Sequence, residues 1–152
     1  MARELFGTDG LRGVAGEYPL DPPTICAVGV ALGRLARRLA ADPEVILGID
    51  TRESGPAIAR RLAGGLAASG VRTRFAGVIT TPGVAYLTRT DDFVAGVIVS
   101  ASHNPFQDNG IKIFGHSGYK LPDGQEHELE AGIFELLRRG VEAGPVELTE
   151  DS

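Results

Sequence analysis

Two serines and a histidine follow directly after an apolar run, a position where hydroxyl groups are candidates for nucleophilic chemistry. The run Val94–Val99 is rich in β-branched residues and predicts a buried strand, and Ser-Ala-Ser-His-Asn-Pro follows it at Ser100–Pro105. Open α/β sheets bind their ligands beyond the carboxyl ends of strands. We therefore expect residues Ser100–Gln107, here called the serine loop, to form part of a functional site.

The spacing of the two serines does not select between them. Ser100 and Ser102 would face the same side if the strand continued, but the turn after Ala101 leaves their directions open. His103 is adjacent in sequence, and neighbouring side chains usually point apart, so a Ser-His pair is not implied. A second interpretation is that the hydroxyls and Asn104 satisfy backbone groups of a tight turn. The chain has no Gly-x-Ser-x-Gly motif, which disfavours an ordinary serine hydrolase.

Three further segments carry groups suited to phosphate binding or proton transfer. Gly7–Gly13 combines three glycines with Arg12, whose guanidinium suits phosphate, although a flexible loop is the alternative and the P-loop ending is missing. Lys112 stands between two isoleucines, and strand alternation places it on the face opposite to theirs. It is either a solvated residue or an acid/base group beside a site. Asp50–Arg52 directly follows a predicted strand. Its aspartate either belongs to the site or caps the next turn.

Composition restricts the class of protein. The chain has 152 residues, 43% hydrophobic content and a net charge of −5, which indicates one globular core without the basic field that nucleic acid or an anionic membrane requires. Cys26 is the single cysteine and is expected at a buried helix position, which fits a cytoplasmic location. We expect no signal segment and no membrane span. His116 and His127 show no metal-ligand spacing.

Strand and helix patterns alternate along the chain. The last two predicted strands are joined by about a dozen turn-forming residues, too short for a helical crossover, so that pair is expected to be antiparallel. The pattern predicts a three-layer α/β/α domain with a mixed, mainly parallel four-stranded sheet carrying one antiparallel strand. Residues 1–140 would form this domain and 141–152 an acidic linker or exposed tail. Helices are expected at 24–41, 54–69, 84–88 and 125–139, strands at 45–49, 71–78, 94–99 and 111–114, and turns at 80–83 and 108–110.

Several segments together resemble the α-D-phosphohexomutase family. The resemblance runs through nearly the whole chain and is nearest to the bacterial phosphoglucosamine mutase branch. The segments that carry it are Leu5–Gly13, Asp50–Gly55, Thr81-Pro82, Ser100–Pro105 and Asp108–Lys112.

The resemblance implies a role for each matching residue. The serine before His-Asn-Pro, here Ser102, would carry a phosphoryl group, donate it to a sugar monophosphate and recover the other phosphate of the bisphosphate intermediate. Lys112 would be the general acid/base, and Arg12 and His103 would line the phosphotransfer site. Asn104 would shape the loop and help bind phosphate. Mg²⁺ would bind Ser102 through its phosphate, with its other ligands in a second domain.

At two points this sequence differs from the pattern of the family that it resembles. Ile49 stands where relatives often have arginine, which implies that Asp50–Arg52 is a structural brace. Family members have four domains, and this chain lacks the family's magnesium, sugar and carboxyl-terminal phosphate motifs.

The expected partners are therefore a sugar phosphate and the remaining three domains of the same polypeptide, with self-association of this chain unsurprising. The implied activity interconverts glucosamine 6-phosphate and glucosamine 1-phosphate, and this chain alone would be inactive. The alternatives are glucose or mannose phosphate specificity, a non-catalytic phosphate-binding module, or a purely structural domain.

Overall fold

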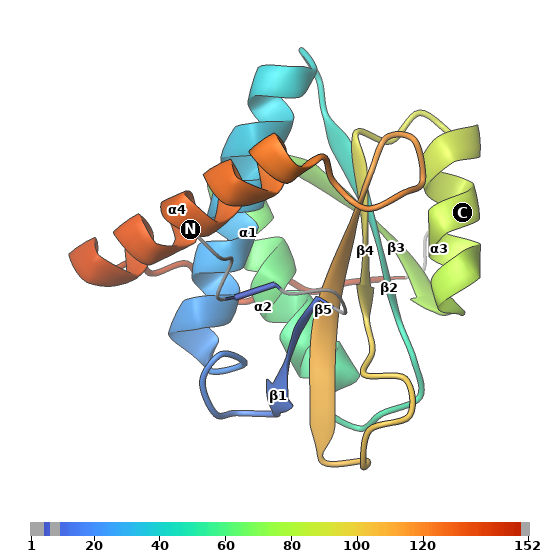
Figure 1. The fold of residues 1–152 in the computed structure, drawn as a ribbon, viewed down its shortest axis with the longest axis vertical. Coiled ribbons are helices and arrows are strands. Elements are labelled where there is room, and N and C mark those ends of the chain that lie inside the picture. The colour runs from blue at the N-terminus through green and yellow to red at the C-terminus, as the bar shows by residue number, and fades with distance from the viewer. Residues whose placement is uncertain (1–4, 7–9, 150–152) are drawn as a thin grey trace.

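One mixed β-sheet with helices on both faces forms the fold (Figure 1). The computed structural model describes residues 5–6 and 10–149. Helices α1, α2 and α4 lie on one face of the sheet and α3 lies on the other. The elements are β1 (Leu11–Val14), α1 (Pro22–Leu39), β2 (Glu44–Ile49), α2 (Gly55–Ala68), β3 (Arg72–Val78), α3 (Thr81–Thr90), β4 (Ala95–Val99), β5 (Asp108–Gly115) and α4 (Asp123–Arg139).

The strand order β1-β5-β4-β2-β3 confirms the predicted α/β class. Strand β2 pairs in parallel with β3 and β4, while β5 runs antiparallel to both of its neighbours, as expected for the last pair of strands. The sheet has five strands among the described residues rather than the predicted four. The prediction missed β1 because its four residues include Arg12 and Gly13 and have no apolar alternation.

Two predicted turns are parts of regular elements. Residues 108–110 begin β5, because β1 pairs with them from Val14↔Asp108 onward and so extends the strand. Residues 81–83 begin α3: the Thr80 side chain accepts a hydrogen bond from the Gly83 amide at 3.0 Å, and Pro82 occupies the first turn. Proline is favoured there because the first helical amides have no intrahelical acceptor.

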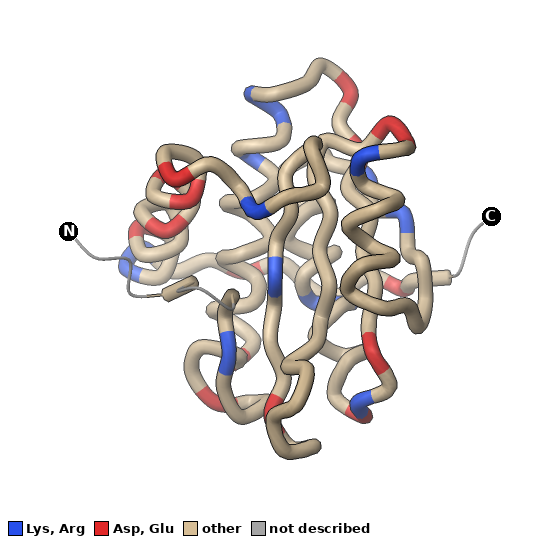
Figure 2. Tube along the Cα trace, turned by 45° about the vertical axis from the view of Figure 1, so that its right-hand side comes forward, with Lys and Arg blue, Asp and Glu red and all other residues tan. Residues whose placement is uncertain are grey.

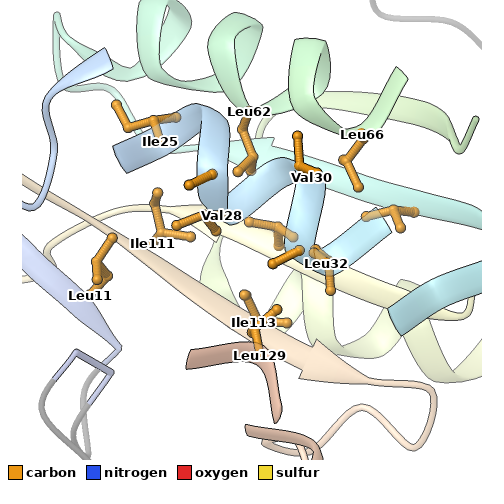
Figure 3. Packing of buried hydrophobic residues seen from close by; sticks show 14 of the residues in the cluster. Leu11, Ile25, Val28, Val30, Leu32, Leu62, Leu66, Ile111, Ile113 and Leu129 are labelled. Carbon is orange, nitrogen blue, oxygen red and sulfur yellow. The ribbon is translucent and has the colours of Figure 1, made fainter. Parts of the chain in front are cut away.

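Buried aliphatic side chains of α1 meet those of α2 and β5, as Val28, Leu62 and Ile111 show in Figure 3. Glycines allow the two helices to approach closely, since a Cβ on Gly65 would lie 2.5 Å from the carbonyl oxygen of Cys26. Cys26 is buried as predicted, and burial raises the pKa of its thiol, while a hydrogen bond with the Ala143 backbone opposes that shift. No helix in the described part of the chain has the length and apolarity to cross a bilayer.

Residues 141–149 follow α4 without helix or strand and lie along α2. The Val146 amide donates a hydrogen bond to the Arg60 carbonyl at 3.1 Å. Gly64 leaves room for the Gly144 backbone, which occupies the space that a Cβ there would fill. The partly buried side chains of this segment that pack on the core are Val141, Ala143 and Leu148.

Candidate functional site

The serine loop leaves the carboxyl edge of the parallel strands. Ile49 and Val99 are register partners at the ends of β2 and β4, and the Asp50 amide donates a hydrogen bond to the Val99 carbonyl at 3.1 Å. Asp50 and Ser100 therefore leave the sheet side by side. This is the edge at which open α/β sheets bind ligands.

The two serines have different environments within the loop. Ser100 is half-buried, and its Oγ accepts a hydrogen bond from the Ser102 amide at 3.2 Å. Ser102 is exposed and has a φ of 53°, in the left-handed region that non-glycine residues rarely adopt. The Asn104 amide donates to the Ala101 carbonyl at 3.0 Å and tightens the turn. Ser100 thus holds the loop, while the Ser102 side chain faces solvent.

A polar chain joins β1 to the loop and to the start of β5. Arg12 Nη1 donates to Asn104 Oδ1, and Asn104 Nδ2 donates to Asp108 Oδ2, both at 3.1 Å. Arg12 Nε is buried and has no hydrogen-bond partner among the described residues. His103 is exposed on the same loop. The structure therefore brings Arg12 and Asn104 together and leaves His103 open to solvent beside Ser102.

Lys112 lies on the face of the sheet that carries α3. It pairs with Ile98, a member of the apolar cluster on that face, and paired residues on adjacent strands share a face. Arg12 pairs with Gly110, two residues before Lys112, so the side chains of Arg12 and Lys112 lie on the same face. The two isoleucines beside Lys112 are buried, as alternation predicted.

Lys112 also lines a small cavity of about 140 Å³. Gly10 contributes to its wall, and Lys120 and Glu126 lie there with Lys120 Nζ 3.5 Å from Glu126 Oε1. Elsewhere, acidic and basic residues are intermixed over the surface, with an acidic stretch on α4 (Figure 2).

Arg52 lies beneath the serine loop and binds its backbone. Its side chain is only 9% exposed, and each of its five N–H groups has an acceptor. This geometry agrees with the structural brace expected at Asp50–Arg52. The acceptors are the carbonyls of Ser102 (2.7 Å), Asn104 (3.0 Å), Pro105 (2.6 Å) and Asp108 (3.1 Å), and Asp50 Oδ2 (3.1 Å).

Asn109 supports the site from below, a role that sequence reasoning missed by placing it in a turn. It is fully buried, its Nδ2 donates to Ser54 Oγ at 2.8 Å, and its Oδ1 accepts from the Gly110 amide at 2.9 Å. A Cβ on Gly110 would lie 2.7 Å from the Ser100 carbonyl oxygen. The pair Asn109-Gly110 is typical of a turn, which is why the sequence predicted one. Only Ser54, the hydrogen-bond partner of Asn109 just before α2, could have indicated that Asn109 is buried.

The described residues do not supply a complete metal site. They contain no group of three or more His, Cys, Asp or Glu side chains placed to hold a metal ion. A phosphoryl group on Ser102 would offer oxygen ligands for Mg²⁺, and the described residues add no cluster of three such side chains to it.

The sheet order and the loop geometry define an α/β/α domain with a presented serine. The chain belongs to the phosphoglucomutase/phosphomannomutase family: residues 3–139 match the family model described as alpha/beta/alpha domain I. It is 62% identical over 149 residues to the phosphoglucosamine mutase of Solibacter usitatus, covering 98% of this chain and 33% of that protein. It is 61% identical over 132 residues to the phosphoglucosamine mutase of Koribacter versatilis, covering 87% of this chain and 28% of that protein.

Solved structures agree with this family. A Thermus thermophilus structure classed with the phosphomannomutases superposes with a TM-score of 0.77 at 32% identity, covering 95% of this chain and 31% of that one. A phosphoglucomutase/phosphomannomutase family protein from Burkholderia thailandensis gives 0.69 at 27% identity, covering 91% and 31%. The chain spans about a third of the length of the curated relatives it matches.

Proposed function

We propose that this chain is the phosphoserine-bearing first domain of a cytoplasmic phosphosugar mutase that interconverts glucosamine 6-phosphate and glucosamine 1-phosphate. The observation that carries the proposal is the exposed, left-handed Ser102 on a braced loop at the carboxyl edge of the sheet. The names of the relatives support the reaction class and the amino-sugar substrate. The domain would work with the remaining domains of a longer polypeptide.

The proposed reaction moves one phosphoryl group at a time. A hydroxyl oxygen of the sugar monophosphate attacks the phosphorus on Ser102, the bond from phosphorus to the serine oxygen breaks, and a sugar bisphosphate forms. After the bisphosphate turns round, the serine oxygen attacks its other phosphate and releases the isomeric monophosphate. Such transfers depend chiefly on positioning and on neutralising charge at the phosphoryl oxygens.

Residues on the Lys112 face would handle protons and charge. Lys112 is proposed to take the proton from the attacking hydroxyl and to return one to the leaving oxygen. Arg12 would neutralise phosphate through the part of its guanidinium not bound to Asn104, and His103 would line the transfer path. Mg²⁺, when bound, would neutralise charge on the Ser102 phosphate, with its other ligands outside this chain.

Phosphopeptide mapping tests the proposal directly. The longer protein that carries this domain should hold stoichiometric phosphate on Ser102 after exposure to glucosamine 1,6-bisphosphate. Ser102→Ala should lower turnover more than about 10³-fold, because the group that relays the phosphoryl is gone. Ser100→Ala is the comparison and should lower turnover far less than Ser102→Ala, since it removes one hydrogen bond that holds the loop but leaves the relay hydroxyl in place.

Two results would reject this function. Absence of phosphate from Ser102 after exposure to the bisphosphate would favour a non-catalytic phosphate-binding module, and retained turnover in Ser102→Ala would exclude Ser102 as the relay. The 152-residue chain alone should not turn over glucosamine 6-phosphate, because it would lack the substrate-binding domains. Turnover by the purified chain would overturn that part of the proposal.

A further inference from the structure

Arg52 has no free donor with which to bind a substrate. Its five N–H groups are all taken by the loop carbonyls and by Asp50, and its side chain is 9% exposed. A guanidinium presents these donors in a fixed planar fork, so its acceptors must hold defined positions relative to one another. Arg52 therefore constrains the loop and does not act on a ligand directly.

The constraint falls on the residue that presents the hydroxyl. A left-handed backbone is unfavourable for a non-glycine residue, so Ser102 needs compensating contacts to stay at a φ of 53°. Arg52 Nη2 binds the Ser102 carbonyl at 2.7 Å, and the Ser102 amide binds Ser100 Oγ at 3.2 Å. Both backbone polar groups of Ser102 are thus fixed, and hydrogen bonds to a charged donor are the stronger kind.

Asp50 fixes the direction of the guanidinium. Its Oδ2 accepts from Arg52 Nε at 3.1 Å, and its Oδ1 accepts from the Arg52 backbone amide at 3.0 Å. Asp50 is itself anchored, because its amide binds the end of β4 through the Val99 carbonyl. The sheet edge, the carboxylate, the guanidinium and the loop thus form one continuous set of hydrogen bonds.

We propose that Arg52 is a positioning residue for phosphoryl transfer, holding Ser102 in its left-handed conformation so that the phosphoserine meets the substrate in a reactive geometry. This inference rests on the proposed function of Ser102. Displacement of a reacting group by about 1 Å costs on the order of 10²-fold in rate, which sets the expected effect.

The experiment compares Arg52→Met and Arg52→Lys in the longer protein, with Arg37→Met as the control. Arg37 also donates to a backbone carbonyl, that of Ser69 at 3.2 Å, but lies on α1 away from the serine loop. The measurements are amide hydrogen exchange of residues 101–108, phosphate occupancy of Ser102, kcat and KM. Wild-type phosphorylation and turnover are measured first, because they test the proposed function independently of Arg52.

Arg52→Met should lower kcat about 10²-fold with KM within threefold, and loop amides should exchange at least tenfold faster, while Arg37→Met changes neither. Arg52→Lys should recover part of kcat, because it keeps the charge but has three donors in place of five. If Arg52→Met does not fold, hydrogen exchange of the loop and kcat are compared between the wild type, Arg52→Lys and Asp50→Asn instead.

Two results would overturn the positioning role alone. One is a kcat of Arg52→Met within threefold of the wild-type value. The other is a loss of activity in Arg52→Met with unchanged hydrogen exchange in the loop. An unphosphorylated, inactive wild type would instead reject the proposed function, and the role of Arg52 in transfer with it.

Discussion

At the scale of single residues, the site depends on buried polar groups that form hydrogen bonds with neighbouring elements. Asn109 has no exposed surface, and it joins Ser54 before α2 to the Gly110 amide on β5. Burial makes the hydrogen bond to the Gly110 amide costly to lose, because that amide cannot turn to water. Asn109 therefore fixes the strand on which Lys112 lies.

Replacing Asn109 tests this dependence. Asn109→Ala should lower the free energy of unfolding by about 1–3 kcal/mol, since the Ser54 hydroxyl and the Gly110 amide lose their partners. Urea unfolding followed by circular dichroism measures the change. Gln107→Ala is the control at a nearby exposed position and should change stability by less than about 0.5 kcal/mol. Equal stability of the two variants would contradict the assigned role of Asn109.

At the scale of elements, glycines set the separation of α1 and α2. The Cβ of an alanine at Gly65 would lie 2.5 Å from the Cys26 carbonyl oxygen and 2.9 Å from the Gly29 Cα, which are backbone atoms that cannot swing aside. Glycine costs a helix about 1 kcal/mol relative to alanine, so its presence there is explained by packing. Because α1 and α2 approach so closely, the buried side chains of both helices join one apolar core with the sheet.

Two glycine-to-alanine variants separate packing from helix propensity. Gly65→Ala should lower the free energy of unfolding by about 1–2 kcal/mol, because overpacking exceeds the gain in propensity. Gly132→Ala on α4 should raise it by up to about 1 kcal/mol, since its Cβ would meet the Ala31 Cβ at an ordinary 3.5 Å. Guanidinium chloride titrations of both variants give the comparison. A Gly65→Ala protein as stable as the wild type would refute the packing argument.

Element prediction succeeded where side-chain periodicity decides the structure. The apolar spacing of α1 and the β-branched run of β4 follow directly from burial of one face or of a whole strand. It failed at β1 and at the first residues of β5, where pairing between β1 and the polar start of β5, Arg12↔Gly110 among the partners, creates the regular structure. Such pairing depends on distant residues and leaves no local pattern.

The site shows the same division. The serine motif indicated the loop, but the role of Arg52 depends on carbonyl groups, which every residue possesses and no sequence distinguishes. The signal that sequence could offer is topological: Asp50 and Ser100 follow adjacent parallel strands and must emerge together. The orientation of Ser102 required the structure itself.

At the scale of the whole molecule, the segment after α4 belongs physically to the core. Residues 141–149 follow α2, and Val146 is hydrogen-bonded to Arg60. The Ala143 backbone reaches Cys26, whose thiol is buried with a raised pKa. The segment therefore covers part of the junction between α1 and α2, and its function as a linker stays a prediction.

Truncation measures how much this cover stabilises the fold. Removal of residues 141–152 should lower the free energy of unfolding by on the order of 1–3 kcal/mol, through loss of the partly buried Val141, Ala143 and Leu148. Cys26 should then react faster with a thiol reagent at pH 8, because its cover is gone. A chain lacking only residues 150–152 is the control. Unchanged unfolding and labelling rates after the longer truncation would show that the segment contributes no cover.

The reversal of β5 gives the serine loop a fixed length. Eight residues, 100–107, join Val99 to Asp108, and the carbonyl acceptors for Arg52 are spaced from Ser102 to Asp108. Surface loops ordinarily tolerate insertions and deletions. Here one added or missing residue would shift every later carbonyl relative to a guanidinium that has no spare donor, so the number of residues in this loop is constrained as firmly as their identity.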